Sequence, residues 1–167
     1  MTVDAYILNL DSLQGLYGRV PRIANEVRVR SLNMDWIGPT LTLRIDLPEF
    51  PDNAPEEWVR AQLDTVQCHL QFLAVEDLSV HAWEPPAAGC IGIVTLPAER
   101  RLRVSFRGAG LEGSFECSDS VLIGHPSAFR IQEDGSDEGP RMFLNRIDAR
   151  RYDTLPAPWE KSYFERV

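Results

Sequence analysis

The stretch VRVRSLNMDWIGPTLTLRIDL, residues 27–47, alternates apolar and polar side chains on both sides of a Gly-Pro turn. Such alternation is typical of strands that bury one face. The second half places Leu41, Leu43 and Ile45 on one face, and the first half changes phase near Ser31. One extra residue in a strand shifts the alternation by one position. The stretch therefore predicts a β-hairpin with a bulge near Ser31.

The stretch TVQCHLQFLAVEDLSVHAW, residues 65–83, predicts a second hairpin that turns at 75–77. In the register that keeps the apolar side chains together, Phe72 lies opposite Val80. The same register makes His69 and His81 diagonal neighbours on the opposite face. We expect that face to be solvated or to form part of a protein-binding surface. Its predicted members are Gln67, His69, Gln71, Ser79, His81 and Trp83.

Further strands are predicted at 90–96, 101–107, 111–117, 120–124, 127–132 and 142–149, and short helices at 10–17 and 56–63. Short connections between strands favour antiparallel neighbours. We therefore expect a mainly β fold, an antiparallel meander of about nine strands with one or two short helices. The strands would form one curved sheet or a two-sheet sandwich. The expected organisation is a single domain over 1–151 and a tail rich in proline and aromatic residues over 152–167.

The composition predicts a globular protein. The chain has 167 residues, of which 44% are hydrophobic and 25% charged, and both fractions are ordinary for a folded domain. No apolar run reaches the roughly 18 residues of a membrane helix, and the N-terminus lacks the basic start of a secretory signal. We expect a cytoplasmic protein. A net charge of −8 opposes binding to nucleic acids and anionic membranes and suits a basic partner.

The sequence offers no pattern that assigns a catalytic residue, a metal site or a cofactor. His69 and His81 lack a third ligand, and His125 lies on another segment. No nucleophile elbow, phosphate-binding loop or EF-hand spacing is present. The three cysteines, at positions 68, 90 and 117, lie in apolar strand patterns, which indicates small buried side chains.

Two acidic segments are the other candidates for partner binding. The first contains Glu49, Asp52, Glu56 and Glu57, and the second contains Glu133, Asp134, Asp137 and Glu138. Acidic surfaces speed the association of a protein with a basic partner. The alternative is that both segments are solvated loops. On the polar strand face, His69, Gln71, His81 and Trp83 are the candidates. Trp83 is the best anchor because interface centres favour tryptophan, although a tryptophan at a strand end is more often a core residue.

Four segments resemble the immunity protein 50 family of bacterial polymorphic toxin systems. They are LYGRVPRI (16–23), VRSLNMDWIGPTLTLRIDL (29–47), DTVQCHLQFLAVEDLSV (64–80) and FECSDSVLIGHPSAFRIQ (115–132), and the resemblance spans about 10–150. It implies a cytoplasmic protein that binds and blocks a cognate toxin in the producing cell, without enzymatic activity or cofactor. It transfers no binding residue. The alternatives are a small-molecule-binding or enzymatic β domain with a concave pocket, and a scaffold domain of a larger complex.

Overall fold

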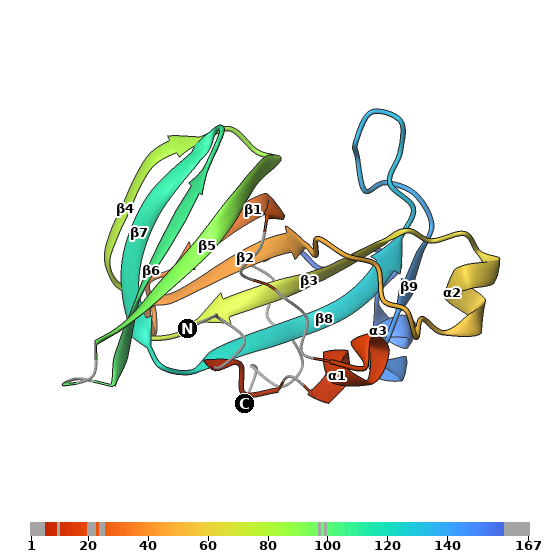
Figure 1. Cartoon of the computed structure of the whole chain (residues 1–167), viewed down its shortest axis with the longest axis horizontal. Coiled ribbons are helices and arrows are strands. Elements are labelled where there is room, and N and C mark those ends of the chain that lie inside the picture. The colour runs from red at the N-terminus through yellow and green to blue at the C-terminus, as the bar shows by residue number, and fades with distance from the viewer. Residues whose placement is uncertain are drawn as a thin grey trace.

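The computed structural model describes residues 6–9, 11–19, 23, 26–96, 98 and 100–158. In this part of the chain, nine strands form one sheet and three helices are short (Figure 1). The elements are α1 (Asp11–Tyr17), β1 (Val27–Asp35), β2 (Thr40–Asp46), α2 (Glu56–Arg60), β3 (Thr65–Phe72), β4 (Glu76–Trp83), β5 (Ala87–Leu96), β6 (Arg101–Gly108), β7 (Leu111–Ser118), β8 (Val121–Phe129), β9 (Arg141–Phe143) and α3 (Arg146–Arg151). The predicted mainly β, antiparallel fold with about nine strands is confirmed.

The sheet has the strand order β4-β7-β6-β5-β1-β2-β3-β8-β9 and curls back on itself (Figure 1). The curvature is evident in the rings of Phe72 on β3 and Phe115 on β7, whose centroids are 5.0 Å apart although four strands separate β3 from β7 in the sheet. Two walls of one sheet therefore face each other across the core.

The short connection between β3 and β4 requires this curl. Only residues 73–75 join the two strands, and a connection of this length spans at most about 14 Å. The two strands nevertheless lie six places apart in the sheet. Ala74 and Asp77 have φ angles of 51° and 52°, which turn the chain sharply. The connection is a corner between the two walls.

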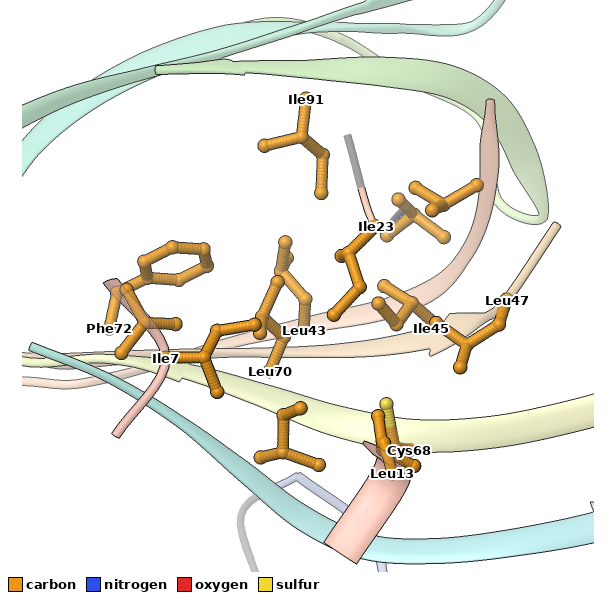
Figure 2. Packing of buried hydrophobic residues seen from close by; sticks show 14 of the residues in the cluster. Ile7, Leu13, Ile23, Leu43, Ile45, Leu47, Cys68, Leu70, Phe72 and Ile91 are labelled. Carbon is orange, nitrogen blue, oxygen red and sulfur yellow. The ribbon is translucent and has the colours of Figure 1, made fainter. Parts of the chain in front are cut away.

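The hydrophobic core fills the concave side of the sheet. Figure 2 shows Ile23 from the N-terminal part of the chain between Ile91 of β5 and the side chains of β2, and Ile7 and Leu13 belong to the same core cluster. Leu13 and Ile23 are fully buried. Burial of such side chains contributes about 1.5–3 kcal/mol each to stability. The N-terminal part therefore completes the core, because it covers apolar side chains that the open, curled sheet would otherwise expose to solvent.

The predicted hairpin at 27–47 is confirmed, and the predicted strands 101–107 and 111–117 pair as antiparallel neighbours as expected. β1 pairs with β2, and the register shifts between Val29 and Ser31, where the phase change predicted a bulge. β6 pairs with β7 so that Arg103 lies opposite Glu116, and these two side chains form an ion pair. In both cases a short turn and matching alternation determined the pairing.

The predicted hairpin at 65–83 is wrong. β3 pairs with β2 and β8, whereas β4 pairs with β7 at the edge of the sheet. Phe72 therefore lies opposite Leu41 and Val121 instead of Val80. The alternation correctly placed Phe72 in the core, where it is fully buried. It could not identify the pairing partner, because any apolar face satisfies the same pattern.

The C-terminal elements also differ from the prediction. The strands expected at 120–124 and 127–132 form the single strand β8, which has a register shift near His125. The strand expected at 142–149 is only β9 followed by α3. Asn145 caps this helix through its side-chain oxygen, which accepts a hydrogen bond from the backbone N–H of Ile147. Ile147 is 50% exposed. The apolar residues of this segment therefore do not form the buried face of a strand.

Candidate functional site

The face predicted to be polar and solvated is buried at its centre. Gln67 is fully buried and His69 is 7% exposed. The loop from 130 to 140 and the first residues of the predicted tail supply the contacts, because Gln67 binds Asp137 and His69 is hydrogen-bonded to the backbone of Pro156. Leu155 of the same tail is 4% exposed. The prediction that His69 lies on a wet face is wrong because C-terminal segments cover that face.

A network of ions and amides occupies this covered face. Arg30, the extra residue of the β1 bulge, donates from Nε to both carboxylate oxygens of Asp46 at 2.9 and 2.8 Å. Gln67 donates from Nε2 to Asp46 Oδ1 at 2.7 Å and to Asp137 Oδ2 at 3.0 Å. Arg44 also binds Asp137 Oδ2. The bulge thus directs a strand arginine away from the core and into the network.

Asp137 is therefore not a free loop carboxylate. Burial raises the pKa of its carboxyl, but the hydrogen bond from Gln67 and the charges of Arg44, Arg30 and Arg141 outweigh burial and lower the pKa. Its side chain is 19% exposed. Among the predicted acidic residues of this loop, Glu133, Asp134 and Glu138 are the exposed ones.

The two predicted acidic segments lie at one end of the molecule (Figure 1). Arg130 joins them, because its guanidinium donates to the carbonyl oxygens of Ala61 and Gln62 at 2.6 and 3.2 Å. Asp64 Oδ1 accepts a hydrogen bond from the Ile131 backbone N–H at 3.0 Å. The start of the 130–140 loop is thus attached to the segment that follows α2.

We call this surface the acidic end and define it by its exposed carboxylates: Asp52, Glu56, Glu57, Asp64, Glu133, Asp134 and Glu138. Glu49 is exposed nearby but pairs with Arg19, and Glu56 pairs with Arg60. The backbone N–H of Ser136 donates to Asp134 and lowers the pKa of that carboxyl. The acidic end therefore presents more carboxylates than arginines at neutral pH.

The remaining predicted residues do not gather at one place. His81 lies on the edge strand β4, far along the sheet from His69 on β3. It is exposed and its Nε2 is 3.0 Å from Ser79 Oγ. Trp83 is half-buried and packs against the core, which makes it a poor anchor for a partner. Gln71 is half-buried on β3. The predicted proximity of His69 and His81 is wrong because their strands do not pair.

The neighbour of His69 is His125. Their ring centroids are 5.4 Å apart, and His125 in turn packs against Tyr152 at 5.5 Å. His125 Nδ1 is 3.0 Å from Asp148 Oδ1 on α3. Burial, together with the charges of His125 and Arg44, lowers the pKa of His69 to about 3. His125 lies on β8 and Asp148 lies on α3, so this pair attaches α3 to β8. The other ring that packs against His125 on the sheet is the His69 imidazole.

The described residues contain no group of three or more His, Cys, Asp or Glu side chains placed to hold a metal ion. Two of the cysteines are buried as expected, and burial raises the pKa of the Cys68 and Cys117 thiols to about 12. The expectation for Cys90 is wrong, because it lies on the outer face of β5 and is exposed. Within the described residues, no helix is long and apolar enough to cross a membrane.

One exposed apolar site was not predicted from the sequence. Trp36 and Ile37, at the turn between β1 and β2, are 73% and 91% exposed. The backbone N–H of Ile37 donates to Asp35 Oδ1 at 3.0 Å, which orders the turn. The available signal was the position of two large apolar residues directly before Gly38-Pro39, since turns usually contain small or polar residues.

Comparison with known proteins identifies the family. The family model described as Immunity protein 50 matches residues 9–125. This span includes the first acidic segment and most of the sheet, and it ends before the loop that contains Asp137. No curated protein and no solved structure matches the chain. Because the match covers more than half of the chain, the protein belongs to the Immunity protein 50 family.

Proposed function

We propose that the protein neutralises a cognate toxin in the cytoplasm of the producing cell by direct contact, and that the acidic end is the surface of first encounter. Family membership supports an immunity role. The observation that carries the choice of surface is the joining of two acidic segments, distant in sequence, through Arg130 and Asp64. A toxin with a basic binding surface would complement this end.

The charge distribution supports steering more than anchoring. The carboxylates of the acidic end are solvent-exposed, and exposed charges act mainly on the rate of association and its salt dependence. Tight binding requires buried contacts, which act on dissociation. The exposed Trp36 and Ile37 side chains are apolar groups available for such a contact.

Co-expression with the toxin encoded by the adjacent gene tests the proposal. The expected result is rescue of growth together with a stoichiometric complex that co-purifies. Rescue without a detectable complex would contradict direct neutralisation and favour enzymatic detoxification. Absence of rescue, with both proteins folded and expressed, would contradict the pairing of this protein with that toxin.

A further inference from the structure

Three arginines converge on one carboxylate in the covered face of the sheet. Arg44 binds Asp137 Oδ2, and Arg141 Nη2 lies 3.4 Å from the same oxygen. Arg30 Nη1 lies 4.0 Å from Asp137 Oδ1. The amide of Gln67 donates to Oδ2 at 3.0 Å. These donors come from β1, β2, β3 and β9, so the sheet itself fixes their arrangement.

The arginines carry more positive charge than the carboxylates around them neutralise. Asp46 is committed to Arg30, with Nη2 to Oδ2 at 2.7 Å. Asp137 then remains as the carboxylate partner of both Arg44 and Arg141. The side chain of Arg141 is 2% exposed, and burial together with the charge of Arg44 lowers its pKa to about 10. Such a surplus favours an anion within the cluster.

The aromatic ring of Phe129 contacts two of these cations. The guanidinium carbons of Arg30 and Arg141 lie 5.4 and 4.9 Å from the ring centroid. This geometry stabilises each cation through the ring face. Arg141 Nη1 also donates to Ser127 Oγ at 2.7 Å. The positions of Arg30 and Arg141 therefore have supports that do not depend on Asp137.

The carboxylate arrives from a loop with its own local hydrogen bonds. The Gln132 backbone N–H donates to the Ser136 carbonyl at 3.0 Å, and the Gly135 N–H donates to the Gln132 carbonyl at 2.9 Å. The loop also contacts the cluster through its backbone, because the Gly135 carbonyl accepts a hydrogen bond from Arg30 Nη2 at 3.0 Å. Asp137 thus binds the arginines as a ligand tethered by its own loop would, and its side chain stays 19% exposed.

We propose that Arg30, Arg44 and Arg141, together with the Gln67 amide, form an oxyanion-binding site that Asp137 occupies from within the chain. The ligand class is a carboxylate or a phosphate group, because planar guanidinium groups match both. The loop 133–140 is then a tethered plug of this site. This proposal does not depend on toxin binding, and either can fail without the other.

The test uses the full chain with Asp137→Ala, titrated with sodium phosphate or sodium acetate at constant ionic strength set by sodium chloride. The thermal midpoint of the variant should rise saturably by at least about 3 °C, with half of the rise at millimolar anion. The wild type should shift by less than about 1 °C, because its tethered carboxylate competes at an effective concentration on the order of millimolar or higher. The anion that gives the larger rise in the thermal midpoint shows whether the site prefers a phosphate or a carboxylate group.

Asp137→Ala combined with Arg44→Gln is the matched control and should lose the saturable rise. If Asp137→Ala does not fold alone, refolding in phosphate or acetate is measured, and recovery of the folded state supports the site. Equal responses of the variant and the wild type would overturn the proposal. A response no larger than that to chloride, or failure of both anions to restore folding, would overturn it too.

Discussion

Acidification from pH 7.5 to 5.5 should destabilise the protein through His69. Burial holds the His69 pKa at about 3 in the folded protein, whereas an unfolded imidazole has a pKa of about 6.5. The unfolded state therefore binds the proton first, and stability falls as the pH drops below about 6.5. At pH 5.5 about ten of every eleven unfolded imidazoles are protonated, which lowers the free energy of unfolding by about 1 to 2 kcal/mol. This loss continues until the pH approaches about 3, the folded-state value.

The assay is urea unfolding at several pH values between 5.5 and 7.5, where most carboxylates stay ionised. His69→Gln should reduce the pH dependence by the amount attributed to His69. His81→Gln is the matched control, because His81 is exposed on β4 and this variant leaves the surroundings of His69 intact. The groups that face His69 are His125, Arg44 and Arg141. Equal pH slopes for the wild type and His69→Gln would refute the assignment of a buried, neutral imidazole.

Two further predictions concern the core and the exposed turn. Phe72→Ala should lower the free energy of unfolding by about 3–5 kcal/mol, because Phe72 is fully buried and contacts Phe115 across the curled sheet. Urea unfolding measures this, and a loss below about 1 kcal/mol would contradict the facing walls. Trp36→Ala should change stability by no more than about 0.5 kcal/mol, since Trp36 is 73% exposed. A much larger loss in the same assay would place Trp36 inside the fold.

Local sequence patterns predicted the local pairings. The hairpin of β1 and β2, including a bulge near Ser31, followed from alternation and a Gly-Pro turn. The hairpin of β6 and β7 followed in the same way. In both, the pairing partners are adjacent in the chain, so one turn fixes the register.

Long-range contacts were beyond the sequence patterns. β3 pairs with β8 rather than with β4, and alternation alone does not distinguish these partners. The surroundings of His69 include His125 and Pro156, which lie far along the chain. Asp137 was grouped with the solvent-facing acids because its arginine partners lie on β1, β2 and β9. Each of these three errors arose from a contact between distant segments.

The most direct test of the central claim is the association rate with the cognate toxin at low and high salt. Glu57→Gln, Glu133→Gln and Glu138→Gln together change the acidic end. Glu76→Gln, Glu84→Gln and Glu112→Gln together are the control at the β4–β7 edge of the sheet. Each set removes three negative charges, which changes the net charge from −8 to −5.

The acidic-end variant should associate about tenfold more slowly at low salt and show a flatter salt dependence, with dissociation nearly unchanged. The control should stay within about twofold of the wild-type rate, because its carboxylates lie away from the proposed encounter surface. Equal slowing of both variants would show that net charge alone sets the association rate, and would contradict a specific role of the acidic end. Wild-type rates and salt dependence for the acidic-end variant would contradict its role in the encounter.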